Sequence, residues 1–223
     1  MLCFSIGLWL LFFTIGSPLL ALSHLSFSFH MIQMSIVFFI IPPLILFGIP
    51  YQLYSKPIRS LVIKRLRSIL PESKTALLIF AILFLLYHIP YLLQIITKYE
   101  LFQKTYVIIL FLLAFRMWWP VATSDPEQRL IGEKRKKYLL ESSWYITPAC
   151  LMFIISALID GMNNPFLGQA ATHLCLPPDS TIQVLPSPFN TRYDQMIAGI
   201  AMMGLHKFSL FATNKLQITP EKD

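Results

Sequence analysis

Apolar residues occur along the chain in long blocks, and short polar or charged stretches separate them. A helix needs about 20 apolar residues to cross the hydrocarbon core of a bilayer. Lipid offers no hydrogen-bond partners to the backbone, so such blocks cross as helices. The pattern predicts an all-α fold, a polytopic membrane helical bundle of about six transmembrane helices, at about residues 1–22, 29–49, 75–96, 105–119, 144–159 and 194–212.

The polar stretches are short, so we expect residues 1–223 to form a single integral membrane domain. The first block could be mistaken for a signal peptide, but the first basic residue of the chain is Lys56, and we interpret the block as a retained helix. Between the second and third blocks, Ile58–Leu70 has apolar residues largely at helical spacing among basic ones. This segment is either an amphipathic surface helix or a solvated basic loop.

Composition agrees with a membrane protein. Of the 223 residues, 56% are hydrophobic and 13% are charged, whereas a soluble domain has roughly 25% charged residues. The net charge of +7 does not predict a nucleic-acid partner, because the basic residues cluster beside the membrane spans, where they indicate topology and anionic lipid. The three cysteines form no CxxC pair, and a disulfide framework is not expected.

The basic residues predict an orientation. Six spans put both termini on one side, and fifteen Lys and Arg residues fall on that side against three on the other, Lys98, Lys104 and Arg192. Basic loops stay in the cytoplasm. We therefore expect a multi-pass protein of the cell membrane with both termini cytoplasmic.

Several polar and sulfur-containing side chains lie inside the predicted spans, where polar groups usually have a function. His30 and Met34 are four residues apart, on one face of a helix. His88 comes from the next span, which runs in the opposite direction. Asp194 lies at the outer end of the last span and Met202 near its middle. The predicted topology gathers these residues in the outer half of the membrane.

Imidazole and thioether groups with one carboxylate favour a soft metal, and copper(I) is the natural candidate. Zinc sites more often show tight Cys/His clusters, and calcium or magnesium requires an oxygen-rich cage. The candidate metal ligands are His30, Met34 and His88, followed by Asp194 and Met202. Each also has a structural interpretation: a helix anchor for His30, an interhelical hydrogen bond for His88, a helix cap for Asp194, and packing for the methionines.

An ordered series of motifs covers nearly the whole chain: Ser17-Pro18-Leu19, Phe29-His30-Met31-Ile32-Gln33-Met34, Pro42-Pro43-Leu44, Gly48-Ile49-Pro50, His88-Ile89-Pro90, Trp118-Trp119-Pro120, and Asp194-Gln195 with Gly199 and Met202. In order and spacing the chain resembles the CtaG family of cytochrome c oxidase assembly factors from Gram-positive bacteria. The resemblance implies a non-enzymatic membrane protein that matures a haem–copper oxidase, with oxidase subunits as partners and copper delivered on the outer side.

The chain departs from that family in three places. The family pattern reads His-Met-x-Gln-His, and Met34 stands where the second His is expected. A Gly-Gly pair of the family is Ala198-Gly199 here. The family usually has seven spans, and the pattern of this chain predicts six, without the first of the family. Thioether in place of imidazole keeps a copper(I) ligand and weakens copper(II) and zinc binding.

Three other functions remain open from the residues alone. A membrane redox protein would use His30 and His88 as axial haem ligands. A small transporter would show an inverted repeat, which is not evident in this sequence. A structural scaffold would require no metal.

Overall fold

A computed structural model describes residues 2–16, 26–50, 70–125, 128–159, 189 and 191–216. Within these ranges every regular element is a helix: α1 (Leu2–Gly16), α3 (Phe27–Ser35), the π-helix η1 (Ile36–Ile40), α4 (Ile41–Gly48), α7 (Ser73–His88), α8 (Pro90–Thr97), α9 (Glu100–Ala122), α10 (Gly132–Ile159) and α12 (Arg192–Leu216). The prediction of an all-α fold is confirmed. Residues 58–69 of the predicted amphipathic segment lie outside the described residues, as do His24, His173 and Cys175.

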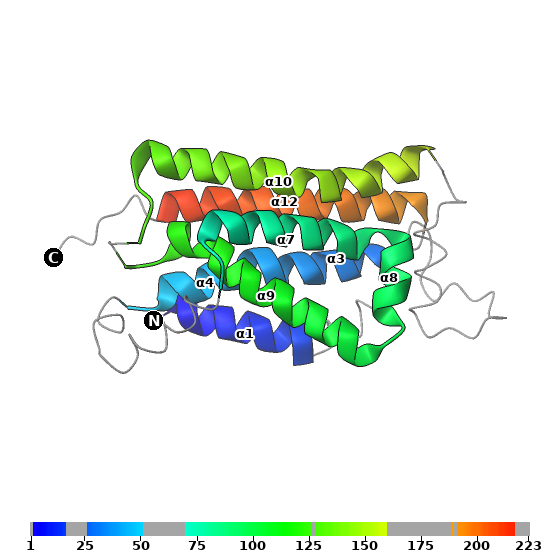
Figure 1. Ribbon diagram of the computed structural model, residues 1–223, viewed down its shortest axis with the longest axis horizontal. Coiled ribbons are helices and arrows are strands. Elements are labelled where there is room, and N and C mark those ends of the chain that lie inside the picture. Colours follow the sequence, from blue (N-terminus) through cyan, green and yellow to red (C-terminus); the bar gives the residue numbers. More distant parts are fainter. Residues whose placement is uncertain are drawn as a thin grey trace.

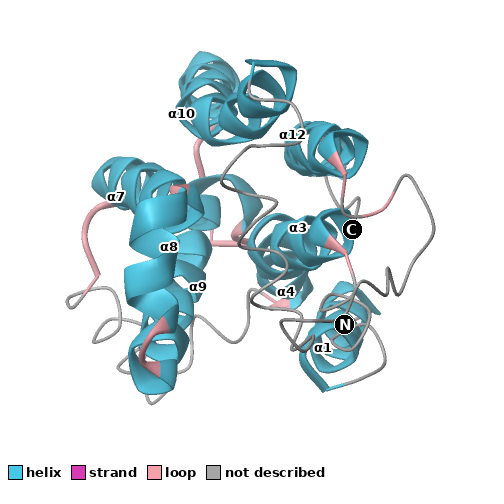
Figure 2. Ribbon diagram, turned by 90° about the vertical axis from the view of Figure 1, so that its right-hand side faces the viewer, coloured by secondary structure: helices cyan, strands magenta, loops and turns pink. Residues whose placement is uncertain are grey.

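The long helices lie side by side and run up and down the long axis of the molecule (Figure 1). The start of α1 and the end of α12 lie at one end of the bundle, and α8 lies at the other end (Figure 1). We call the latter the α8 end. Seen from there, the α3–α4 rod is central, with α1, α12 and α9 around it (Figure 2). The strongest packing pairs are α10 with α12, α1 with α4, α3 with α12, and α7 with α9.

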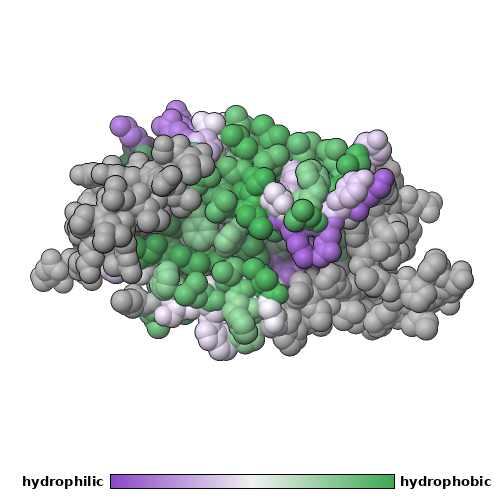
Figure 3. All heavy atoms as spheres, turned by 60° about the horizontal axis from the view of Figure 1, so that its bottom comes forward, coloured by the Kyte–Doolittle hydropathy of each residue, from purple (hydrophilic) through white to green (hydrophobic). Residues whose placement is uncertain are grey.

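Within the described residues, four helical segments are long and apolar enough to cross a membrane: Phe27–Gly48, Glu100–Ala122, Gly132–Ile159 and Arg192–Leu216. The helices α1 and α7 are also apolar but shorter. Apolar side chains cover the middle of the face in Figure 3, and large ones such as Trp9, Ile108 and Phe208 point outward from the bundle. An apolar exterior around a packed interior is what lipid requires, and the structure supports a membrane protein.

Two predicted spans have different limits in the structure. The third divides into α7 and α8 at Ile89, whose extended backbone (φ −74°, ψ 124°) is the conformation favoured for a residue before proline. The fifth begins at Gly132 instead of about residue 144. Its charged first part is helical as well, and an ion pair of 2.7 Å between Lys136 and Glu133 spans one turn there.

The central rod contains a proline pair inside a continuous helical path. Pro42 and Pro43 have no N–H to bond the carbonyls of Phe38 and Phe39, four residues earlier. Side chains from other helices replace those bonds: Trp118 Nε1 donates to the Phe38 carbonyl at 3.0 Å and Ser209 Oγ donates to the Phe39 carbonyl at 2.5 Å. The path widens into η1 just before the prolines, and the rod is joined to α9 and α12.

Candidate functional site

His88 ends α7 at the α8 end of the bundle and is 2% exposed. Its Nδ1 lies 2.5 Å from the Phe84 carbonyl oxygen, one turn earlier. A carbonyl only accepts hydrogen bonds, so this contact requires the proton on Nδ1. The lone pair of the neutral ring is then on Nε2, and that nitrogen is buried with no hydrogen-bond partner among the residues that the structure describes.

Aromatic rings surround this imidazole. The ring centroids of Phe84, Tyr87 and Phe153 lie 4.5, 5.4 and 5.3 Å from that of His88. Phe153 comes from α10, and its ring also lies 5.2 Å from Phe27 at the start of α3. The rings exclude water from His88, so its Nε2 atom is a strong acceptor in an apolar surrounding.

His30 lies in the first turn of α3, where its backbone N–H donates to the Ser26 carbonyl at 3.1 Å. Its side chain is partly exposed. His30 lies near the start of α3, and His88 lies at the end of α7. They come from helices of opposite direction, at the end of the bundle where α3 starts and α7 finishes.

Asp194 is completely buried near the start of α12. Its Oδ2 atom accepts hydrogen bonds from Ser26 Oγ at 2.8 Å, Phe27 N at 3.1 Å and Ser28 N at 3.4 Å. These are the first donors of α3, which a helix cannot satisfy by itself. The carboxylate therefore caps α3, a different helix from the one that carries it.

Gln195, the next residue, holds α12 against α10. Its Nε2 atom donates to the Phe153 carbonyl at 3.0 Å, and its Oε1 atom is buried without a hydrogen-bond partner in the described part of the chain. The Asp194-Gln195 pair thus joins α12 to two neighbours at the α8 end. Its position at a helix start suggested a cap, and the structure shows hydrogen bonds from Asp194 to the start of α3 and from Gln195 to α10.

The candidate methionines are buried in the core. Met34 is 6% exposed and Met202 0% exposed, on the two helices α3 and α12 that pack against each other. The ring centroid of His206, a buried histidine of α12, lies 4.7 Å from that of Phe39, and its Nε2 atom lies 3.4 Å from Ser142 Oγ.

Across the described ranges, no group of three or more His, Cys, Asp or Glu residues is close enough to hold a metal ion. A metal at the α8 end would therefore depend on the two imidazoles and on sulfur or amide ligands.

Sequence reasoning passed over Ser26 and Ser28, although Ser-x-Ser before an apolar run is typical of a helix start. It also passed over Phe153, for which a lone aromatic residue gives no signal.

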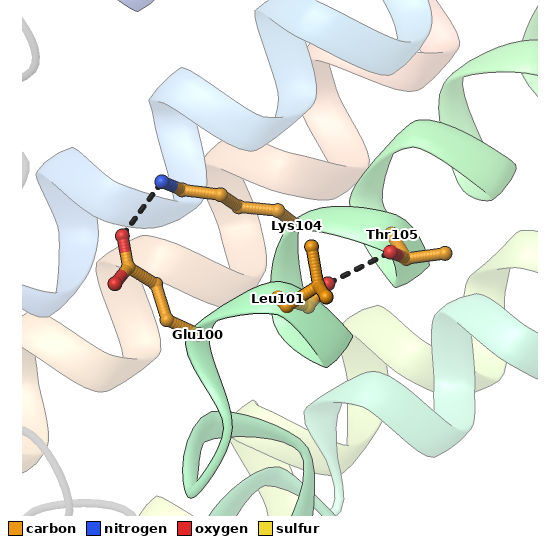
Figure 4. Close-up of polar contacts among 4 residues, drawn as sticks. All are labelled: Glu100, Leu101, Lys104 and Thr105. Carbon is orange, nitrogen blue, oxygen red and sulfur yellow. Dashed lines mark hydrogen bonds and ion pairs between the residues drawn. The ribbon is translucent and has the colours of Figure 1, made fainter.

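The rim of the α8 end carries ordinary surface contacts. Lys104 and Glu100 form an exposed ion pair of 2.6 Å at the start of α9, and Thr105 Oγ1 donates to the Leu101 carbonyl at 2.7 Å (Figure 4). Exposed pairs of this kind contribute little to stability, because water and salt screen them. They therefore mark a polar boundary and not a binding site.

The family model for cytochrome c oxidase caa3 assembly factors, Caa3_CtaG, matches residues 1–213. That range is nearly the whole chain of 223 residues. The curated proteins and the solved structures compared with the chain gave no match. By its match over almost all of its length, the chain belongs to the Caa3_CtaG family of cytochrome c oxidase assembly factors.

Proposed function

We propose that the chain assists the maturation of a haem–copper oxidase by binding copper(I) transiently at the α8 end and passing it to an oxidase subunit. Copper is the cargo of this function and not a resident cofactor. The observation that carries the proposal is the Nε2 atom of His88, buried and without a hydrogen-bond partner in the described residues. A buried acceptor without a partner costs about 1–3 kcal/mol, so a function is expected to explain it.

The surroundings of His88 fit a metal ligand. Histidines that bind metals usually donate their other ring N–H to a carbonyl or carboxylate, which fixes the tautomer and the ring. His88 does this through Nδ1 and the Phe84 carbonyl. His30, near the start of α3, supplies a second imidazole at the same end of the bundle, and Met34 and Met202 are the thioethers on α3 and α12. Copper(I) accepts this combination of ligands.

The proposed orientation puts the α8 end outside the cell. The basic segments of the sequence lie at the opposite end under the predicted topology, and basic segments stay in the cytoplasm. Ligands from two helices without a closed cage hold an ion weakly enough to release it. We therefore propose delivery on the outer side of the cell membrane by ligand exchange, with no chemical reaction catalysed by the chain itself.

The test compares His30→Ala and His88→Ala with the wild type in cells that depend on the chain for oxidase maturation. We expect each variant to remain in the membrane at the wild-type level while oxidase activity falls severalfold. Met203→Leu is the matched control, because Met203 neighbours Met202 but is partly exposed. Normal oxidase activity and normal copper(I) binding in both histidine variants would show that the site is assigned wrongly.

An absorption spectrum separates this function from the haem alternative. The proposal predicts no Soret band in the purified protein. A Soret band that disappears in His88→Ala would favour a haem protein instead. The family match itself gives no support to a haem protein or to a transporter.

A further inference from the structure

The carboxylate of Asp194 joins α12 to the helix that carries His30. Its Oδ2 atom accepts from Ser26 Oγ, Phe27 N and Ser28 N at 2.8–3.4 Å. Ser26 occupies the N-cap position of α3, yet its own side chain does not cap the helix. A cap that is usually made within the helix is here made by Asp194 from α12.

The carboxyl group of Asp194 is completely buried at the end of the bundle where the proposed copper site lies. His30 lies two residues beyond Ser28, so at about 1.5 Å per residue it is only a few ångströms along the helix axis from the donors that Asp194 holds. Imidazoles and thioethers are neutral ligands. A cation that they bind therefore brings an uncompensated charge into a low-dielectric interior, which is strongly unfavourable without a counter-charge.

We propose that Asp194 is a positioning and charge-compensating residue, which fixes the first turn of α3 and neutralises a monovalent cation held by His30 and His88. This inference rests on the proposed function. One carboxylate cancels the charge of copper(I) or silver(I), whereas a divalent ion would keep a net charge of +1 in the interior. The charge balance therefore selects soft monovalent cations, in addition to the ligand chemistry.

The size of the effect follows from Coulomb's law. Two unit charges about 8–10 Å apart at an effective dielectric constant of about 20 change a binding constant by on the order of tenfold. Asp194→Asn keeps an acceptor oxygen and the size of the side chain but removes the charge. Ser26→Ala removes one hydrogen bond to the same oxygen and keeps the charge.

The experiment measures silver(I) and copper(I) affinity of the full-length protein in detergent, under anaerobic conditions for copper(I). We expect Asp194→Asn to weaken binding of both ions about tenfold, and Ser26→Ala to stay within threefold of the wild type. Both variants should lower the unfolding temperature of the metal-free protein, because both weaken the cap. Unchanged affinity in Asp194→Asn would overturn the inference, as would an equal loss in Ser26→Ala, which would mean a structural role alone.

A second variant is measured if Asp194→Asn does not accumulate in the membrane. Ser28 lies in the same first turn of α3 and is 3% exposed, so Ser28→Asp combined with Asp194→Asn returns a carboxylate to the α3 N-terminus. Silver(I) affinity within threefold of the wild type supports charge compensation, and a tenfold loss contradicts it.

His88→Ala separates the two proposals. If His88→Ala loses silver(I) binding while Asp194→Asn keeps it, the copper site stands and the role of Asp194 is wrong. If His88→Ala binds silver(I) as the wild type does, the proposed copper site itself is wrong, and the role of Asp194 falls with it.

Discussion

Met34 is the residue at which the chain departs from the His-Met-x-Gln-His pattern of the family that it resembles. The side chain is buried on α3, one turn beyond His30. A thioether there favours copper(I), whereas an imidazole would accept copper(II) and zinc as well. Under the proposed function, the side chain at this one position therefore sets which metal the site prefers.

Met34→His is expected to raise zinc affinity relative to copper(I) affinity by about tenfold or more, since it replaces a soft ligand by a borderline one. Competition titrations with a chromophoric chelator measure both affinities. Met31→His is the matched control, because Met31 is equally buried on α3 but lies three residues earlier and on a different face from His30. The same gain in zinc affinity in both variants would contradict a specific role for Met34.

The hydroxyl of Ser209 donates a hydrogen bond to the Phe39 carbonyl. Pro43, four residues after Phe39, has no N–H to serve as the usual helical donor to that carbonyl. Ser209→Ala removes this side-chain donor from that carbonyl. We expect a loss of about 1–2 kcal/mol in the free energy of unfolding. Chemical unfolding in detergent measures it.

Ser143→Ala is the control for Ser209→Ala, because Ser143 bonds the exposed Lys207 and is only partly buried. Its loss should change the free energy of unfolding by no more than about 0.5 kcal/mol. An equal effect in the two variants would mean that the carbonyl freed by the proline pair does not need its donor.

At the scale of elements, α1 depends on a close approach to α4. A Cβ atom built on Gly48 would collide with the backbone and side chain of Phe4, and one on Gly7 would lie 2.7 Å from Ile45 Cγ1. Small residues at such crossings let transmembrane helices pack through dispersion forces. The pairing of α1 with α4 therefore requires glycine at both positions.

Gly48→Ala is expected to destabilise the bundle by about 1–3 kcal/mol, because α1 must move away from α4 to admit the methyl group. Gly204→Ala is the matched control, since a Cβ atom there meets nothing within 4 Å. Thermal unfolding in detergent compares the two. A similar unfolding temperature for both variants would contradict the close packing of α1 on α4.

The positions of the helices could be predicted from the sequence, but the hydrogen bonds between helices could not. Apolar block length locates a membrane helix because lipid demands it, and Pro90 in the sequence marks the break between α7 and α8. The partners of the Phe38 and Phe39 carbonyls are Trp118 and Ser209, 80 and 170 residues away in the chain. Nothing local to Pro42 and Pro43 identifies them.

The candidate histidines could also be named from the sequence, but the hydrogen bonds around them could not. His30 and His88 stand out because imidazoles are rare inside apolar blocks, and the opposite directions of their helices place them at one end. The cap from Asp194 to α3 was not predictable, because a carboxylate at a helix start is typical of a cap for that same helix. Its hydrogen-bond partners on α3 and the residue before it, Ser26 to Ser28, are 166–168 residues away.

At the scale of the whole molecule, a buried acidic residue, Asp194, and a buried basic residue, Arg135, lie at opposite ends of the bundle. Asp194 lies against the N-terminus of α3, where the helix dipole favours a negative charge. Arg135 donates to the Thr213 carbonyl at 2.7 Å and to the Val121 carbonyl at 3.4 Å, near the C-termini of α12 and α9, where the dipole favours a positive charge. Each buried charge is thus paired with helix ends of the opposite sign.

The predicted orientation has a direct test at this scale. Since basic segments stay in the cytoplasm, a fluorescent reporter fused after Asp223 should fold and emit, and a periplasmic-type phosphatase at the same place should be inactive. A phosphatase inserted in the predicted outer segment 163–188 is the control and should be active. The reverse pattern would put the α8 end, and with it His88, on the cytoplasmic side.

The copper content of the protein after anaerobic loading with copper(I) and removal of free metal, compared between the wild type and His88→Ala, shows whether His88 holds the metal. We expect copper in stoichiometric amount in the wild type and a loss of most of it in His88→Ala, with both proteins equally folded. Equal copper in the two proteins, or none in the wild type, would contradict that expectation.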